Sequence, residues 1–250
     1  MKIKNKKYKE WDIYFPEREL FLLKIGEKII DNNFHIVKIL KDTKRNYVAI
    51  IEIDQIKYIL KEFRSEVIIP QRRVQTVFKD GEALTTLKNS LSAIEEGINE
   101  LVSPLIAIIK RRKMIEKSYL LMEYINGENL KTKEDIDEVV KIAQKIHSLG
   151  RYHGDLNTSN FIKTRNGIKI IDTQMKKENK FFYKRGYDIL TLKEDLLVLC
   201  LSYDIDENYK YKTKDIGYYI AKIIKKIKNL KVIKKIKRKK KKLREKGWKI

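Results

Sequence analysis

The stretch that decides the fold is HGDLNTSNFIKTRNGIKIID, residues 153–172. Its second half alternates apolar and polar residues around Asn166-Gly167, a pair typical of tight turns, so it predicts a β-hairpin that closes near Asp172. Its first half is too polar and too rich in turn-forming residues for a regular element. A loop held between a helix and a hairpin is a usual place for functional residues.

Three residues of this stretch, Asp155, Asn160 and Asp172, have the order and spacing of the catalytic loop and metal aspartate of a kinase. Phosphoryl transfer consists mostly of positioning and charge neutralisation, so it requires oxygen ligands on magnesium and a carboxylate near the acceptor hydroxyl. We assign Asn160 and Asp172 to the metal and Asp155 to the acceptor. Alternatively, HGD is an ordinary turn and the other two are polar residues at strand ends.

The chain before this stretch is typical of a small sheet with a helix. Residues 34–63 contain three alternating runs separated by KDTKRN and DQ, which predict a three-stranded antiparallel meander. A helix is expected from about Lys79 to Glu96, ending at Gly97. Two more strand-like runs follow, LIAIIKRRK and KSYLLMEYI, and the turn NGEN is the expected boundary between two lobes.

The rest of the chain is typical of helices. NGEN leads into a helix whose apolar positions are Ile136, Val139, Val140, Ala143 and Ile146, and the last third contains EDLLVLCL and a long lysine-rich segment. We therefore expect an α+β, bilobal protein-kinase-like fold with the active site between the lobes. The small antiparallel-sheet N-lobe would span residues 1–122, the mainly helical C-lobe residues 123–233, and a basic tail residues 234–250.

The expected N-lobe contains candidate nucleotide-binding residues. Lys61, in the apolar run IKYILKEF, has the position of the kinase lysine that contacts the α and β phosphates, although it is also readable as an edge residue and Lys57 competes. Glu82 is either the carboxylate partner of Lys61 or an ordinary acidic residue at a helix N-terminus. Backbone groups near Glu123 and Tyr124 would pair with adenine, unless YLLMEYI is only a core strand.

Some expected kinase features are missing from the sequence. The turn KDTKRN lacks the glycines of a phosphate-covering loop, so Lys41, Lys44 or Arg45 would contact the phosphates instead. Asp172-Thr173-Gln174 replaces D-F-G and no A-P-E segment follows, which argues against a protein-kinase type of activation loop. Asp195 resembles the aspartate that braces the catalytic loop, or is a helix N-terminal charge.

Composition restricts the partners. Of the 250 residues 42% are hydrophobic, enough for one large domain or two small lobes. The sequence has no long uncharged apolar stretch and no apolar region after its basic start, so we expect neither secretion nor a membrane span. The single Cys200 excludes an internal disulfide and is expected to be a buried thiol, with the cytoplasm as location. The formal net charge of +23 favours anionic partners.

The basic end predicts a surface contact. Apolar residues from Ile220 to Ile236 recur at helical spacing among many lysines, so we expect an amphipathic helix that lies on an anionic membrane. The alternative is that its apolar face packs on the C-lobe. Beyond Lys234 the chain has too little apolar surface to bury, which favours an electrostatic contact or disorder.

From about residue 31 onward the chain resembles the lipopolysaccharide core heptose(II) kinase family, an offshoot of the kinase-like fold in Gram-negative bacteria. The similarity rests on NNFHIVKILKD, KYILKEF, YLLMEYINGENL, GDLNTSNFIKTRNGIKIID and GYYIAKIIKKIKNL, in that order. It implies transfer of the γ-phosphate of ATP, with Mg²⁺, to a heptose of the lipopolysaccharide core at the cytoplasmic face of the inner membrane. GDLNTSN also resembles RIO-type kinases and kinases associated with tRNA modification, and these or a binding-only pseudokinase are the alternatives. Nucleic acid is a less favoured partner.

Overall fold

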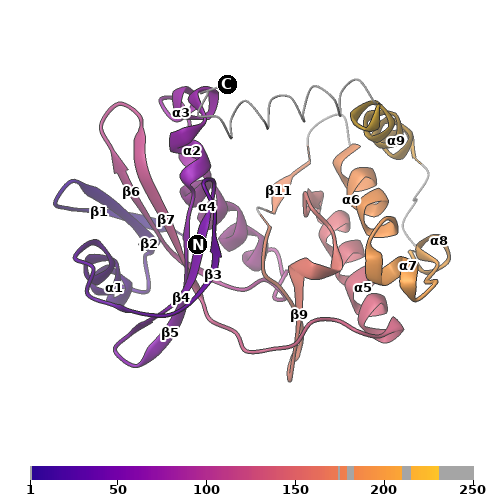
Figure 1. Ribbon diagram of the computed structural model, residues 1–250, viewed down its shortest axis with the longest axis horizontal. Helices are drawn as coiled ribbons and strands as arrows, with labels where there is room; N and C mark the ends of the chain where they lie inside the picture. The colour runs from indigo at the N-terminus through magenta and orange to yellow at the C-terminus, as the bar shows by residue number, and fades with distance from the viewer. Residues whose placement is uncertain (1, 174, 179–182, 210–214, 231–250) are drawn as a thin grey trace. The chain divides into compact units, whose positions relative to one another are not determined.

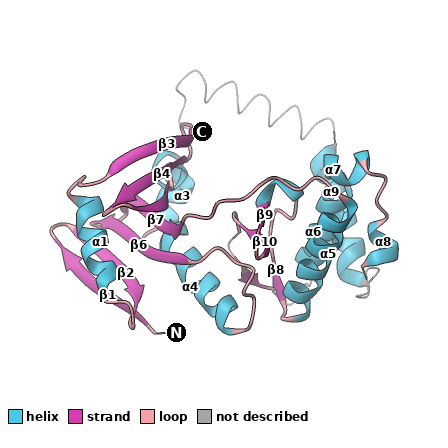
Figure 2. Ribbon diagram, turned by 90° about the horizontal axis from the view of Figure 1, so that it is seen from below, coloured by secondary structure: helices cyan, strands magenta, loops and turns pink. Residues whose placement is uncertain are grey.

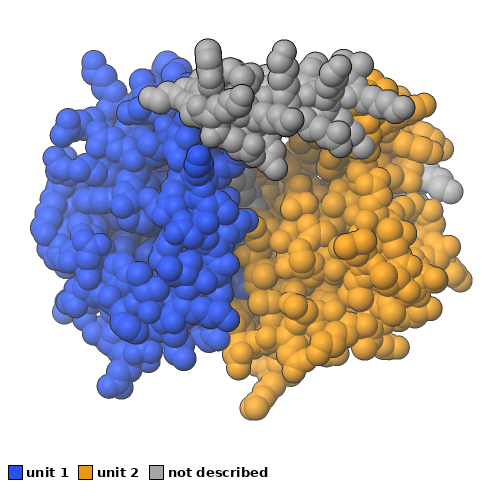
Figure 3. All heavy atoms as spheres, viewed as in Figure 1, with its two compact units in different colours: residues 1–95, 102–124, 247–250 blue, residues 96–101, 125–246 orange. Residues whose placement is uncertain are grey.

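The computed structural model describes residues 2–173, 175–178, 183–209 and 215–230 (Figures 1 and 2). The chain divides into two compact units (Figure 3). One unit contains the described residues up to Glu95 together with Val102–Tyr124. The other contains Glu96–Leu101 and the described residues from Ile125 onward.

Seven strands in the described part of the first unit form one antiparallel sheet (Figure 1). They are β1 (Ile3–Tyr8), β2 (Trp11–Pro16), β3 (His35–Asp42), β4 (Tyr47–Ile53), β5 (Ile56–Glu62), β6 (Pro104–Arg111) and β7 (Ile115–Glu123). Their order is β1-β2-β6-β7-β5-β4-β3, so the predicted meander is confirmed as β3, β4 and β5. The strands β1 and β2 were not predicted; the β1 run IKNKKY has almost no apolar alternation, whereas β2, WDIYFP, is rich in apolar residues and was overlooked.

Helices cover both faces of this sheet (Figure 1). On one face α1 (Phe21–Ile30) buries Leu22, Ile25 and Ile29 against strand residues such as Phe15. On the other face lies α4 (Gly81–Glu95), which confirms the predicted helix and contributes Leu84, Leu87 and Leu91 to a second core cluster. Burial of each such side chain is worth roughly 1.5–3 kcal/mol. Two short helices, α2 (Arg64–Ile68) and α3 (Pro70–Gln75), precede α4.

The second unit contains the predicted hairpin and most of the helices. Its described elements are α5 (Lys133–Ser148), β8 (Arg151–Tyr152), the 3₁₀ turn η1 (Thr158–Asn160), β9 (Phe161–Thr164), β10 (Gly167–Ile170), β11 (Lys176–Lys177), α6 (Tyr183–Lys193), α7 (Leu196–Cys200), α8 (Ile205–Asn208) and α9 (Ile216–Asn229). A capping box starts α5: the Thr132 side chain accepts from the Asp135 N–H, and the Asp135 carboxylate accepts from the Thr132 N–H. The five predicted apolar positions of α5 are buried.

Close packing of α6 and α9 depends on a glycine. A Cβ on Gly186 would lie 2.7 Å from the Cα of Tyr218, so only glycine allows the two helix backbones to approach this closely. The buried face of α9 consists of Gly217, Tyr218 and Ala221, whereas Ile223 and Ile227 remain exposed. The alternative in which the apolar residues of this segment simply pack on the C-lobe therefore does not hold for these two isoleucines.

The helix α7 corrects one prediction. Because α7 has only five residues, the apolar run LLVLCL turns away from the core, and of α7 only Val198 is buried. Leu196 is 79% exposed and Leu199 is 59% exposed. Cys200 is also exposed, so the expected buried thiol is wrong. None of the helices in the described ranges is long and apolar enough to cross a membrane.

The second unit has a charged anchor at Arg151, whose side chain is 1% exposed. Its Nε and Nη2 donate to the two carboxylate oxygens of Glu96, at 2.6 and 2.8 Å, and its Nη1 donates to the Met175 carbonyl at 2.6 Å. The guanidinium thereby connects the segment after α4 to the chain that follows Asp172. It also lowers the pKa of the Glu96 carboxyl from 4.5 to about 2.

We expect Glu96→Gln to lower the free energy of unfolding at pH 7 by about 1–3 kcal/mol, because it leaves a buried guanidinium without its carboxylate. A carboxyl whose pKa is lower in the folded than in the unfolded protein stabilises the fold at pH values above its unfolded pKa. The difference in the free energy of unfolding between wild type and Glu96→Gln should therefore shrink as the pH falls from 4.5 to 2. Urea unfolding across this range measures it. The control is Glu128→Gln, which removes an exposed carboxylate paired with Lys131. Equal losses in both variants would contradict the anchor.

Candidate active site

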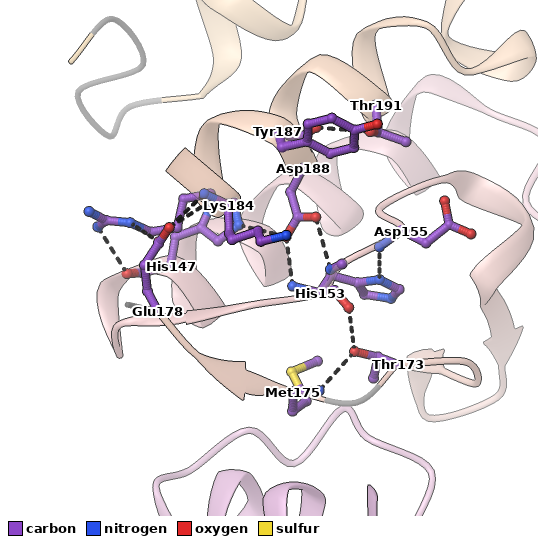
Figure 4. Close-up of polar contacts among 12 residues, drawn as sticks. His147, His153, Asp155, Thr173, Met175, Glu178, Lys184, Tyr187, Asp188 and Thr191 are labelled. Carbon is purple, nitrogen blue, oxygen red and sulfur yellow. Dashed lines mark hydrogen bonds and ion pairs between the residues drawn. The ribbon is translucent and has the colours of Figure 1, made fainter. Parts of the chain in front are cut away.

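A buried carboxylate fixes the start of the loop that follows β8 (Figure 4). Asp188, on α6, is fully buried, and its two oxygens accept the N–H groups of His153 at 2.6 Å and Gly154 at 2.9 Å. The Nε2 of His147 lies 3.3 Å from one of these oxygens. Gly154 has φ +94°, a conformation that glycine adopts without strain. The backbone before Asp155 is therefore held at several points.

Asp195 braces the second half of the same loop. Its oxygens accept the N–H and the hydroxyl of Thr158, both at 2.9 Å, and also the N–H of Leu197 at the start of α7. The two alternatives for Asp195, loop brace and helix N-terminal charge, therefore both hold. Sequence reasoning missed Asp188. The sequence offers one weak sign of its burial: Asp188 precedes the apolar Ile189, which is also buried on α6.

Asp155 is exposed, and its carboxylate points away from the Asp188 contacts in Figure 4. Within the described ranges this carboxylate has no hydrogen-bond partner, whereas the Asp155 N–H donates to the Nδ1 of His153 at 3.3 Å. The His153 ring packs on Phe161 with centroids 5.5 Å apart, and burial lowers the pKa of this histidine. A neutral imidazole therefore supports the backbone beneath an accessible carboxylate.

Asn160 precedes the first strand of the hairpin and Asp172 follows the second, so both residues lie at the open end of the hairpin, opposite its turn. Phe161 pairs with Ile170 in β9 and β10, and the Ile171 N–H donates to the Asn160 carbonyl at 3.0 Å. The Nδ2 of Asn160 donates to the Asp155 carbonyl at 2.7 Å. This contact assigns the amide orientation and leaves the Oδ1 as the atom that can accept a ligand. The three sequence-predicted residues of this loop are thus brought together.

Lys61 lies in the interior of the sheet of the first unit. Its strand β5 pairs with β4 and β7, so Lys61 is not an edge residue. Its side chain is half-buried, and its Nζ lies 5.3 Å from the ring centroid of Phe63, which belongs to the core cluster beside α4. The competing Lys57 is exposed. The role of Lys61 toward a nucleotide stays a prediction.

Glu82 lies in the first turn of α4, where its carboxylate accepts from the Nη1 of Arg72 at 2.6 Å. A second glutamate, Glu66, was not singled out from the sequence. Its oxygens accept the Glu82 N–H at 2.5 Å and the Ser118 hydroxyl at 3.1 Å, and burial raises the pKa of its carboxyl. Nothing in the run RSEVI distinguishes Glu66 from a surface residue. The pairing of Glu82 with Lys61 stays a prediction.

The other predicted nucleotide contacts lie at the ends of strands. The Glu123 N–H donates to the Ser103 carbonyl at 3.1 Å, and Tyr124 follows it. The turn between β3 and β4 is closed by Thr43, whose N–H and hydroxyl both donate to the Asn46 carbonyl at 3.0 Å. It is a tight turn that contains exposed basic residues at positions 44 and 45, and the exposed Lys41 lies just before it.

Along most of its length the chain is similar to known proteins. The sequence matches the family described as lipopolysaccharide core biosynthesis protein (WaaY) over residues 2–239. The lipopolysaccharide core heptose(II) kinase WaaY of Escherichia coli K12 is 25% identical over 232 residues, covering 90% of this chain and 94% of that protein. The KEOPS complex subunit Bud32 of Pyrococcus abyssi is 28% identical over 156 residues, covering 58% of this chain and 64% of that protein.

A shorter match is to a probable bifunctional tRNA threonylcarbamoyladenosine biosynthesis protein of Methanobrevibacter smithii. It is 30% identical over 117 residues, which cover 42% of this chain and 22% of that protein. An antiparallel-sheet unit, a largely helical unit and these relatives together confirm the expected α+β, kinase-like fold. The relatives that match along nearly the whole length are kinases, so the chain is a phosphotransferase. With the match over residues 2–239, it belongs to the lipopolysaccharide core biosynthesis protein (WaaY) family.

Proposed function

We propose that the chain transfers the γ-phosphate of ATP to a hydroxyl of a heptose in the lipopolysaccharide inner core. The observation that carries this proposal is the loop in which Asn160 donates to the backbone of Asp155 and accepts from the N–H of Ile171, the residue before Asp172. The match to the heptose kinase family over nearly the whole chain supports the choice of acceptor. The matches to tRNA-related proteins cover shorter parts of the chain, so an atypical protein kinase is the weaker candidate.

In this proposal Asp155 orients the acceptor hydroxyl and accepts its proton as the oxygen attacks phosphorus. Its carboxylate is exposed, while its backbone is held by His153 and Asn160. A rigid backbone under an accessible carboxylate limits the orientations of the hydroxyl. Such positioning accounts for most of the rate in phosphoryl transfer.

The residues present fit Mg²⁺. The Oδ1 of Asn160 and the carboxylate of Asp172 are hard oxygen donors, which this ion prefers. In the described ranges no group of three or more His, Cys, Asp or Glu side chains is placed to hold a metal. Two protein ligands suit an ion that is also bound by nucleotide phosphates and water. When bound, the ion would neutralise the charge that develops on the transferred phosphoryl group.

Residues of the first unit are proposed to bind the nucleotide. Lys61 would contact the α and β phosphates, with Glu82 as its predicted carboxylate partner, and backbone groups near Glu123 and Tyr124 would contact adenine. The Glu123 N–H already donates to Ser103, so the adenine contact would use other backbone groups of this segment. Because the β3–β4 turn lacks glycines, flanking basic residues such as Lys44 would meet the phosphates as point charges.

We also propose that the protein works in the cytoplasm at the anionic surface of the inner membrane, where a lipid-linked acceptor would lie. The described part of the basic C-terminal helix supports this. Along α9 and its C-cap residue the exposed apolar residues recur every three or four positions beside lysines; they are Ile216, Tyr219, Ile223, Ile227 and, at the C-cap, Leu230. An apolar stripe next to cationic side chains suits a bilayer interface. The tail, residues 234–250, lies outside the described residues.

Replacing the proposed metal carboxylate tests the metal assignment. We expect Asp172→Asn to abolish Mg²⁺-dependent ATP turnover while leaving the fold intact, as circular dichroism would show, because an amide is a far weaker ligand than a carboxylate. The matched control is Asp54→Asn in the β4–β5 turn, where φ is +51° and asparagine is well tolerated. Unchanged turnover in Asp172→Asn would refute the assignment.

Removing the proposed base tests the role of Asp155. We expect Asp155→Ala to lower kcat roughly 10²–10⁴-fold, because the acceptor loses its orienting carboxylate. The affinity for ATP, measured by calorimetric titration, should change little. A large loss of ATP affinity, with normal turnover per bound nucleotide, would instead assign Asp155 to the nucleotide.

Vesicle binding tests the membrane proposal in two parts. Removing residues 234–250 should sharply reduce the salt-sensitive part of binding to anionic vesicles, because this deletes a dense run of basic residues whose attraction is screened within about 10 Å at 0.1 M salt. Ile223→Ser with Ile227→Ser should weaken the part that persists at high salt, because both side chains are exposed on α9. Equal binding of all proteins at every salt concentration would contradict membrane docking.

A further inference from the structure

A cavity of about 590 Å³ lies beside Asp155 within the second unit. One wall is the loop after Asp155, and the others come from α6, the start of α7 and Lys225 of α9. Its volume is within the roughly 300–1,000 Å³ of ordinary small-ligand sites. Tyr187 and Thr191 of α6 line the cavity together with Asp155, and Figure 4 shows these two residues above Asp188 and the Asp155 carboxylate to the right of it.

The charge of the cavity is opposite to that of the whole protein. Its described lining includes the carboxylates of Asp155, Glu194 and Asp195 but only one cationic residue, Lys225. The chain as a whole has a net charge of +23. The other polar side chains of the lining are uncharged; they are Asn157, Thr158, Ser159, Tyr187 and Thr191.

The positive charge of Lys225 is already used inside the protein. Its side chain is 13% exposed, its Nζ donates to the Leu190 carbonyl at 2.7 Å, and the Glu194 Oε2 lies 2.9 Å from it. The same Nζ lies 5.4 Å from the centroid of the Tyr187 ring. Lys225 therefore orients Glu194 rather than offering a free ammonium to an anion. The Glu194 side chain is 61% exposed, so the carboxylate can still accept hydrogen bonds from a ligand.

We infer that this cavity binds the acceptor sugar and selects a neutral, hydroxyl-rich ring over one that already carries a phosphate. The inference rests on the proposed kinase function. Asp155 and Glu194 accept hydrogen bonds from sugar hydroxyls, and charged acceptors make the stronger hydrogen bonds. A phosphate on the same ring would lie among carboxylates and be repelled.

The same repulsion acts on the product. Transfer forms an O–P bond to the acceptor oxygen, breaks the bond from the γ-phosphorus to ADP and gives the hydroxyl proton to Asp155. The product ring then carries a phosphate with about −1.5 to −2 charge at neutral pH. Beside Asp155, Glu194 and Asp195 this charge favours release of the product and disfavours its return.

Variants of Glu194 test this inference in the full-length protein. The acceptors are a neutral heptosyl oligosaccharide and the same oligosaccharide with one phosphate on the acceptor heptose and a hydroxyl still free. Wild type should prefer the neutral acceptor. Glu194→Gln should raise KM for the neutral acceptor roughly tenfold, without changing KM for ATP. Glu194→Lys should reduce the preference for the neutral acceptor. Controls are Glu207→Gln and Glu207→Lys on α8, whose residue 207 is exposed and does not line the cavity.

A binding measurement distinguishes failure of the cavity inference from failure of the proposed kinase function. Binding of the neutral oligosaccharide is monitored by NMR in the presence of a non-hydrolysable ATP analogue. If wild type phosphorylates heptose but both Glu194 variants keep its KM and its preference, the cavity inference is overturned while the proposed function stands. If no heptosyl acceptor is phosphorylated, but wild type binds the oligosaccharide and Glu194→Lys does not, the cavity stands and the heptose kinase function fails. Absence of both turnover and binding overturns both.

Discussion

The burial of one carboxylate is the constraint on which the active-site loop depends. An ionised carboxylate inside a protein costs several kcal/mol unless donors surround it. Asp188 meets this requirement with the N–H groups of His153 and Gly154 and with His147. Because these donors belong to the loop backbone and to α5, satisfying the charge also fixes where the loop begins. From that point the chain reaches Asp155, Asn160 and, through the hairpin, Asp172.

Carboxylates of the second unit divide into structural groups and accessible groups. Asp188, Asp195 and Glu96 each hold backbone or guanidinium donors, and together they support both halves of the loop and the segment after it. Asp155 and Asp172 are exposed. This division has a physical reason: a carboxylate saturated by internal donors has little capacity left for a substrate hydroxyl, whereas the exposed Asp155 carboxylate, on a backbone held by His153 and Asn160, retains that capacity.

The sequence predicted the parts of this protein that have strong local signals. Alternating apolar runs predicted the meander of β3, β4 and β5. The spacing of Asp155, Asn160 and Asp172 predicted the loop between β8 and the hairpin. Local sequence patterns failed to predict burial where it depends on how helices pack in the folded protein. Asp188 and Glu66 look like surface residues until the helices around them are packed. Cys200 lies in an apolar run that ends after five helical residues, so apolar character there did not mean burial.

The acidic cavity beside Asp155 would explain how a strongly basic protein acts on a neutral sugar, as we propose, because its described lining contains three carboxylates and one lysine, Lys225, which is paired with Glu194. The proposed kinase reaction can be tested by mass spectrometry, with phosphorus NMR, of a neutral heptosyl core oligosaccharide incubated with the full-length protein, ATP and Mg²⁺. We expect one phosphate monoester on a heptose hydroxyl, formed only when ATP and the metal are both present. An unmodified oligosaccharide, recovered while the protein phosphorylates a polypeptide under the same conditions, would contradict it.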